Sequence, residues 1–315
     1  MVDFAFLDSG TGGIPYLLHL MEKSPDSECI YVGDTANFPY GQKSHEEVVD
    51  CAISVCKKIV EKFNPKVIVV ACNTMSVNAL DILREAFPEQ KFVGTVPAIK
   101  VAGDISKKRC IGLLATNATI QHPYNQDLKN HFAGDCKMIL QGAPELISFI
   151  EKKSFTASGE EIENAIRPTV KFFRQQGCDV IILGCTHFLN YADVFKKLAM
   201  PDIKVVDSVE GVVNRALDLQ AGEVNNLQAG DVRSLRSLPS FAFDCKEIGR
   251  QNIAGRRLRP VQGVAEDREA GWSEGGMPPS LNHSKVYITG FYDKKDEKEY
   301  DVICKRHNLE FGGII

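Results

Sequence analysis

The stretch Lys66-Val-Ile-Val-Val-Ala-Cys-Asn-Thr74 is similar in pattern to a later stretch, Asp179-Val-Ile-Ile-Leu-Gly-Cys-Thr-His187. In each, an uninterrupted apolar run ends in a small residue, a cysteine and two polar residues, and a helix-like segment follows. Apolar runs rich in Val and Ile are typical of strands that are covered on both faces of a parallel sheet. A second pair, Phe6–Gly13 and Leu113–Thr119, also runs from a strand into small and hydroxyl residues. These pairs predict two similar α/β halves whose matching strand ends share one cleft.

The same alternation of apolar runs and amphipathic stretches extends over most of the chain. We expect buried strands at Phe4–Leu7, Cys29–Val32, Val67–Ala71, Lys91–Gly94, Cys110–Leu114, Lys137–Leu140, Val180–Leu183, Lys204–Val206 and 285–290. We expect helices at Glu46–Phe63, Ser76–Ala86, Gly159–Gln176, Tyr191–Leu198 and Glu297–His307. Strand and helix in alternation predict an α/β fold, here two similar α/β domains with mainly parallel sheets and an active site in the cleft between them.

Residues 225 to 284 differ from the rest of the chain, with scattered Gly, Pro, Arg and Ser and little sustained periodicity. Such a composition is typical of a flexible insertion. The arginines between Arg250 and Arg259 also fit a basic docking segment, but further on arginine mixes with acids, as in Glu266-Asp-Arg-Glu269. We therefore interpret this segment as a flexible insertion.

The composition narrows the class of protein. The 315 residues, 44% of them hydrophobic, suffice for two domains of ordinary size or one large α/β unit. The 37 Lys and Arg nearly balance the 41 Asp and Glu, and a formal net charge of -4 argues against broad nucleic-acid binding. We find neither a secretory leader nor an apolar run near the roughly 20 residues of a membrane helix. With ten cysteines and no exporting signal, we expect a cytoplasmic protein with free thiols and no membrane partner.

Polar side chains gather at the carboxyl ends of the expected strands, where open α/β sheets bind their ligands. These residues are Asp8, Ser9, Cys72, Asn73, Thr74, Cys185, Thr186 and His187. Each strand end leads towards a helix N-terminus, whose free backbone N–H groups favour anions. Because the motifs contain no Arg or Lys, we expect backbone amides and hydroxyls to hold the carboxylates of an amino acid.

Cys72 and Cys185 are candidate bases on opposite sides of the cleft. Inverting an α-carbon without a cofactor requires one base to remove the α-proton and a protonated partner to return a proton to the other face. Thiols suit both roles, because they titrate near pH 8.5 and their pKa can be lowered. We expect Asp8 and His187 to adjust or relay protons for Cys72 and Cys185 respectively. The donors expected to stabilise the anionic intermediate are those of Asn73, Thr74 and Thr186.

Each of these residues also has a structural interpretation. A cysteine after a Val/Ile strand is usually a small buried hydrophobe, and Asp8-Ser9 fits a helix cap. The Gly-rich Ser9–Gly13 is similar to a phosphate loop, but it lacks the Lys-Ser/Thr ending and the Gly-x-Gly-x-x-Gly spacing. Cys185-Thr-His187 lacks the paired spacing of zinc ligands, and Cys178 should lie at the opposite end of its strand. The matched pair of strand-end cysteines favours catalysis over nucleotide or metal binding.

At these motifs the chain resembles the glutamate racemases, within the wider aspartate/glutamate racemase superfamily. The matching segments are Asp8–Gly13, Gly33–Ser44, Ala71–Thr74, Leu114–Thr119, Phe149–Glu151 and Gly184–His187. The resemblance covers about Asp3 to Leu219 and resumes from Val286 to His307. It implies a role for Glu151 in tuning the second half of the site. The substrate contacts that it implies come from Pro39, Tyr40, Gly41, Thr116 and Thr119.

The resemblance implies an enzyme that interconverts L- and D-glutamate, supplies D-glutamate for bacterial peptidoglycan and needs no pyridoxal phosphate, metal or nucleotide. Many members of that family are homodimers. By the same resemblance, the first domain takes residues 1–96 with about 207–224 and 285–315, and the second takes 97–206. Residues 225–284 have no counterpart.

The chain departs from the family pattern at two points beside the catalytic motifs, and the first bears on pocket volume. Met75 stands where the family usually has a small residue, and Phe188-Leu-Asn-Tyr191 replaces the usual run after the histidine. An aspartate racemase and a non-catalytic ligand-binding or regulatory relative remain alternatives. Proteins that resemble aspartate racemases tend to carry Glu at the position of His187, so this histidine favours glutamate.

Overall fold

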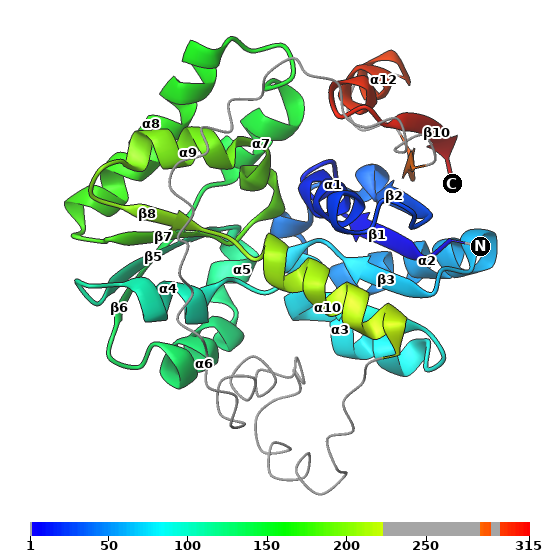
Figure 1. The fold of residues 1–315 in the computed structure, drawn as a ribbon, viewed down its shortest axis with the longest axis horizontal. Coiled ribbons are helices and arrows are strands. Elements are labelled where there is room, and N and C mark those ends of the chain that lie inside the picture. Colours follow the sequence, from blue (N-terminus) through cyan, green and yellow to red (C-terminus); the bar gives the residue numbers. More distant parts are fainter. Residues whose placement is uncertain (1, 223–283, 291–296) are drawn as a thin grey trace, which may run out of the picture. The chain divides into compact units, whose positions relative to one another are not determined.

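Two parallel sheets hold the strands of the described residues, 2–222, 284–290 and 297–315, in this computed structural model (Figure 1). The first sheet has the order β10-β9-β2-β1-β3-β4. Its strands are β1 (Phe4–Asp8), β2 (Cys29–Gly33), β3 (Val67–Val70), β4 (Lys91–Gly94), β9 (Lys285–Ile288) and β10 (Glu310–Ile314). The second has the order β6-β5-β7-β8, with β5 (Cys110–Ala115), β6 (Lys137–Gly142), β7 (Val180–Leu183) and β8 (Lys204–Val206). The predicted α/β class with mainly parallel sheets is confirmed.

The two sheets repeat one topology. In the first sheet the order β2-β1-β3-β4 corresponds strand by strand to β6-β5-β7-β8 in the second, and every neighbouring pair is parallel. The repeat makes β1 equivalent to β5 and β3 equivalent to β7. These are the same two pairs that the sequence patterns matched, so the internal similarity of the chain corresponds to a repeated arrangement of strands.

Helices connect the strands. They are α1 (Ile14–Lys23), α2 (His45–Phe63), α3 (Asn73–Ala86), α4 (Ile99–Ile105), α5 (Asn117–Gln121), α6 (Pro123–Phe132), α7 (Pro144–Lys152), α8 (Gly159–Gln175), α9 (Ala192–Ala199), α10 (Val209–Ala221) and α12 (Glu297–Arg306). Short 3-10 turns are η1 (Thr35–Asn37), η2 (Tyr40–Gln42) and η3 (Thr186–Tyr191). The two longest helices, α2 and α8, begin at capping boxes in which a serine and a glutamate three residues later exchange hydrogen bonds. None of the helices in the described part of the chain is long and apolar enough to cross a membrane.

The central strands form the core. Every residue of β1, β2, β3 and β7 is buried, as the uninterrupted apolar runs predicted. β10 was not predicted, because Gly312 and Gly313 interrupt its apolar pattern and glycine is a poor strand former. It nevertheless pairs with β9, and the register shifts between Phe311 and Gly313, as in a β-bulge. The predicted insertion, 225–284, lies outside the described residues apart from Ser284, and so does the alternative of a basic docking segment.

Candidate active site

Cys72 and Cys185 occupy equivalent positions in the repeat. Each lies two residues after its strand, β3 or β7, and directly before the helical segment that follows, α3 or η3. Their backbones are nearly identical, with φ −141° and ψ 116° at Cys72 and φ −139° and ψ 136° at Cys185. An extended residue at this point turns the chain from strand to helix at the carboxyl end of the sheet, where ligands of parallel sheets bind.

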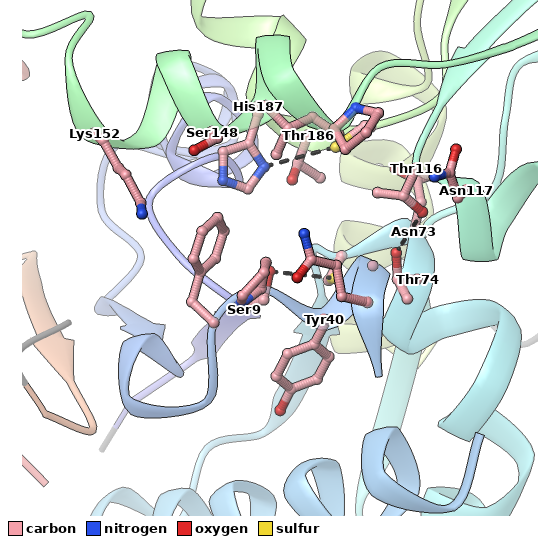
Figure 2. Close-up of a pocket in the computed structure, with 18 residues that line it drawn as sticks. Ser9, Tyr40, Asn73, Thr74, Thr116, Asn117, Ser148, Lys152, Thr186 and His187 are labelled. Atoms are coloured by element: carbon pink, nitrogen blue, oxygen red, sulfur yellow. Dashed lines mark hydrogen bonds between the residues drawn. The ribbon is translucent and has the colours of Figure 1, made fainter. Parts of the chain in front are cut away.

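Both cysteines line one pocket of about 340 Å³ (Figure 2). This volume is within the usual range for a small-molecule site. Of the residues singled out from the sequence, those that line it are Ser9, Pro39, Tyr40, Gly41, Cys72, Asn73, Thr74, Thr116, Cys185, Thr186 and His187. Asp8, Thr119 and Glu151 do not line the pocket; they are buried and bond to residues that do.

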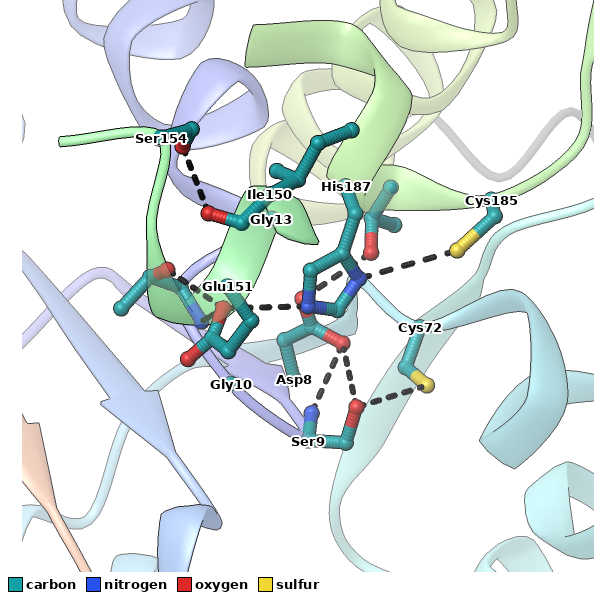
Figure 3. Close-up of polar contacts among 12 residues, drawn as sticks. Asp8, Ser9, Gly10, Gly13, Cys72, Ile150, Glu151, Ser154, Cys185 and His187 are labelled. Carbon is teal, nitrogen blue, oxygen red and sulfur yellow. Dashed lines mark hydrogen bonds and ion pairs between the residues drawn. The ribbon is translucent and has the colours of Figure 1, made fainter. Parts of the chain in front are cut away.

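Asp8 lies beside Cys72, joined to it through Ser9 (Figure 3). One carboxylate oxygen of Asp8 accepts from the Ser9 backbone N–H at 2.7 Å, and the Ser9 hydroxyl lies 3.9 Å from the Cys72 sulfur. Burial raises the pKa of Asp8, and the nearby His187 offsets only part of that rise. Burial, and after it the charge of Asp8, raises the pKa of Cys72 well above its usual value. A hydrogen bond from the Met75 backbone N–H lowers this pKa but does not offset the rise. Cys72 therefore rests as a protonated thiol at neutral pH.

Cys185 contacts His187, which in turn contacts Glu151 (Figure 3). Nδ1 of His187 lies 3.6 Å from the Cys185 sulfur, and Nε2 lies 3.1 Å from Oε2 of Glu151. Burial alone would lower the pKa of His187, but its hydrogen bonds to Cys185 and Glu151 outweigh burial and raise that pKa well above the usual value. At neutral pH the imidazole therefore holds a proton that it can exchange with the thiol. Among the described side chains, no group of three or more Cys, His, Asp or Glu is placed to hold a metal ion.

The site has two half-sites, one with Cys72 and Asp8 and one with Cys185, His187 and Glu151. Each half-site contributes a hydroxyl that binds the carboxylate of the other. The Thr186 hydroxyl, next to Cys185, donates to Asp8 at 3.0 Å. The Thr11 hydroxyl, in the loop after Asp8, donates to Glu151 at 2.7 Å. Each bond joins residues more than 100 positions apart in the chain. Thr11 was not predicted, because a hydroxyl in a Gly-rich loop carries no local signal of its partner.

Three threonine hydroxyls meet at one wall of the pocket. Oγ1 of Thr74 lies 3.0 Å from that of Thr116 and 3.3 Å from that of Thr119. Thr116 also caps α5 by accepting from the Thr119 backbone N–H. A Cβ added to Gly41 would lie 2.9 Å from Cβ of Thr116, so glycine lets the η2 loop approach this cluster.

Asn73 presents a free donor to the pocket. Its side chain is 4% exposed, and among the described residues its Nδ2 has no hydrogen-bond partner. A buried amide left without a partner costs free energy unless a ligand or water completes it. Asn73 is also the first residue of α3, whose N-terminal N–H groups favour an anion. Both features fit a carboxylate at this end of the pocket.

The loop that carries Tyr40 is anchored at its base. The Tyr40 hydroxyl donates to Asp34, which also accepts from Asn37 and, at 2.6 Å, from the hydroxyl of Thr289 after β9. Asp34 is buried, so these donors compensate its charge. Thr289, directly after β9, thereby helps to hold the loop that carries Tyr40 into the pocket.

One face of α7 was missed in the sequence. Pro144, Ile147, Ser148 and Lys152 line the pocket, and their spacing places them on one side of a helix. That periodicity, together with Glu151 on the same helix, could have revealed them. Lys152 is the one Lys or Arg among the described residues that line the pocket (Figure 2). The other lining residues, which were not predicted individually, are Phe38, Gln42 and Asn117.

Met75 does not reach the pocket. Its side chain is fully buried and is not among the lining residues. Met75 is therefore part of the buried core, and other side chains set the size of the pocket.

Gly12→Ala should damage the site directly. An added Cβ would lie 2.7 Å from the His187 backbone nitrogen and 2.8 Å from the Thr186 hydroxyl, so η3 would have to shift. Overpacking of this kind costs about 1–3 kcal/mol, and we expect Tm to fall by several degrees. Gly159→Ala is the matched control, because nothing lies within 4 Å of its added Cβ. Thermal unfolding of both variants tests this packing; an unchanged Tm for Gly12→Ala would refute it.

The sequence and the fold are similar to those of known proteins. Residues 17–216 match the family model described as Asp/Glu/Hydantoin racemase. A glutamate racemase of Treponema pallidum (strain Nichols) is 41% identical over 216 residues, which cover 69% of this chain and 80% of the relative. The solved Escherichia coli glutamate racemase, in complex with L-glutamate and the activator UDP-MurNAc-ala, is 30% identical. It has a TM-score of 0.63, over 70% of this chain and 83% of that one.

A further solved structure is similar in fold. A glutamate racemase of Bacillus anthracis covers 100% of this chain and 97% of its own, with a TM-score of 0.69 and 20% identity. At that identity the likeness concerns the fold alone. The family model and the 41% identical relative carry the assignment. The chain therefore belongs to the Asp/Glu/Hydantoin racemase family, and its resemblance to the glutamate racemases is confirmed.

Proposed function

We propose that the protein interconverts L- and D-glutamate by proton transfer at the α-carbon between Cys72 and Cys185. One observation carries the proposal: two thiols at equivalent points of a repeated fold line a single pocket. A repeat related by near symmetry presents its two copies to a bound ligand from different sides, as a two-base inversion requires. The similarity to proteins named glutamate racemase supports glutamate as the substrate.

The pocket offers donors for both carboxylates of glutamate. The unpartnered Nδ2 of Asn73, the start of α3 and the hydroxyls of Thr74 and Thr116 suit one carboxylate. Ser9 and Lys152 also line the pocket and suit the second, while Gly41 of the η2 loop lies against Thr116 at the first.

The reaction needs one thiolate and one thiol at a time. The thiolate takes the α-proton, and the electron pair of the C–H bond moves into the α-carboxylate to give a planar dianion. The opposite thiol then gives its proton to the other face, and the two cysteines end in exchanged protonation states. Asp8 beside Cys72 and His187 beside Cys185 are placed to restore those states between turnovers. Donors at the carboxylate would stabilise the intermediate.

The proposed proton transfer requires no pyridoxal phosphate, metal or nucleotide. D-Glutamate is a building block of bacterial peptidoglycan, and we propose that the protein supplies it.

Incubation with L-glutamate and, separately, L-aspartate tests the substrate. Optical activity should decay to zero with glutamate and should persist with aspartate. Decay with aspartate in place of glutamate would make the protein an aspartate racemase. If neither amino acid racemised and neither exchanged its α-hydrogen with D₂O, a non-catalytic binding protein would be the better account.

A further inference from the structure

We propose that Thr11 is a positioning residue for the Cys185 half of the site, acting through Glu151 and His187. The inference rests on the proposed function, in which Cys185 is one of the two bases. It assigns a role to a loop residue of the first sheet in the chemistry of the second.

Three hydrogen bonds converge on one oxygen. Oε2 of Glu151 accepts from the Thr11 hydroxyl at 2.7 Å and from the Thr11 backbone N–H at 3.3 Å. The same oxygen lies 3.1 Å from Nε2 of His187, whose Nδ1 lies 3.6 Å from the Cys185 sulfur. Thr11, Glu151 and His187 are each at most 3% exposed. The hydroxyl bond is the shortest in this series, so it does most to fix the carboxylate oxygen that orients the imidazole.

The loop also packs closely against the carboxylate. A Cβ added to Gly10 would lie 2.9 Å from Oε1 of Glu151, so the backbone of this loop lies directly against the carboxylate group. The backbone bond alone leaves a long contact of 3.3 Å, which constrains rotation of the carboxylate weakly. The hydroxyl of Thr11 therefore makes the shortest of the bonds given for Oε2 and holds it beside His187.

The opposite half contains the counterpart of this bond. Thr186 donates to Asp8, which serves Cys72, as Thr11 donates to Glu151, which serves Cys185. Each half-site thus depends on a hydroxyl from the motif of the other half. A displacement of either loop would disturb both bases together, which suits a reaction in which the two thiols must hold opposite protonation states.

Several titratable groups face His187, and the test must separate them. They are Glu151 on α7, Cys185 at the start of η3 and Asp8 at the end of β1, while Cys72 and Lys152 line the same pocket. Thr11 is bonded to Glu151 among these groups. Removing its hydroxyl should loosen the Glu151–His187 bond, and the burial that opposes a charged imidazole should then lower the pKa of His187.

The experiment compares Thr11→Val, which removes the hydroxyl at nearly constant shape, with Thr11→Ser, which retains it. For Thr11→Val we expect kcat/KM for glutamate to fall roughly tenfold, the usual value of a hydrogen bond to a charged group. We also expect the limb of the pH–rate profile that reports His187 to move to lower pH. Thr11→Ser should restore most of the rate and the position of that limb.

NMR titration of the His187 imidazole gives a readout that needs no turnover, with His187→Gln to assign the signal. Its midpoint should fall in Thr11→Val and return towards wild type in Thr11→Ser. Thr95→Val is the matched control: Thr95 is fully buried and donates to the Val70 carbonyl at 2.6 Å, away from Glu151. That variant should lose stability with the histidine midpoint unchanged.

The outcomes separate the two proposals. A wild-type protein that does not racemise glutamate overturns the proposed function, while the histidine titration still tests Thr11. An active wild type whose His187 midpoint is unchanged or higher in Thr11→Val overturns the positioning role. The same holds if Thr95→Val moves the midpoint equally, since the effect would then come from general loosening of the fold.

Discussion

Cys72→Ser and Cys185→Ser should each lower kcat/KM for glutamate by about 10³-fold or more. A serine hydroxyl has nearly the shape of the thiol but is a far weaker acid, so it can neither hold a negative charge at neutral pH nor return a proton readily. Loss of a general acid or base typically costs 10²–10⁴-fold, and here each group must serve as both. Racemisation of both enantiomers by purified variants measures the loss.

The two variants should differ in their isotope effects. L- and D-glutamate have equal free energies in solution, so kcat/KM must fall equally in both directions. For the enantiomer whose α-proton the weakened base removes, that removal becomes rate-limiting and the substrate deuterium isotope effect should rise. For the other enantiomer it should fall, and the pattern should reverse between the two variants.

Cys56→Ser is the control for this pair. Cys56 is a fully buried free cysteine on α2 and does not line the pocket. We expect it to lose stability while it keeps the wild-type kcat/KM. If either active-site variant kept near-normal rates, that cysteine would not be a base.

Asp8→Asn should lower the activity. Asp8 is fully buried beside Cys72, and removing its charge should lower kcat/KM by about 10²-fold, within the range for a group that assists proton transfer. Steady-state rates in both directions measure this. A kcat/KM within twofold of wild type would show that the Asp8 charge is not needed.

The same variant should gain thermal stability relative to wild type as the pH rises. Burial raises the pKa of Asp8, so the folded state binds that proton more tightly than the unfolded chain, whose carboxyl titrates near pH 4. Wild-type stability should therefore fall as the pH increases from about 4 through the raised pKa, while asparagine does not titrate. Unfolding curves from pH 4.5 to 8 give the Tm difference, and a difference independent of pH would contradict the raised pKa of Asp8.

Much of the fold follows from local patterns. Uninterrupted apolar runs predicted β3 and β7 because both faces of those strands are covered, and the residues after them predicted where the strands end. β10 could not be predicted in this way, because Gly312 and Gly313 interrupt its strand pattern. Its pairing with β9 depends on tertiary contacts.

The chemistry of the pocket could be predicted less fully. The two strand-end cysteines could be predicted, because the ends of parallel strands lie at the ligand-binding edge of the sheet. Thr11 could not, since its partner Glu151 is 140 residues away and nothing local marks the bond. Ser148 and Lys152 could have been found from helical spacing, but only once α7 was known to face the pocket.

The direct test of the central claim is racemisation of L-glutamate in D₂O, stopped early and analysed for deuterium at the α-carbon of each enantiomer. Two bases on opposite faces predict that the newly formed D-glutamate carries deuterium, because its proton comes from a second thiol equilibrated with solvent. The recovered L-glutamate should remain protiated. D-Glutamate that retained the original α-hydrogen, or equal deuterium in both enantiomers from the outset, would mean that a single base serves both faces and would contradict the paired roles of Cys72 and Cys185.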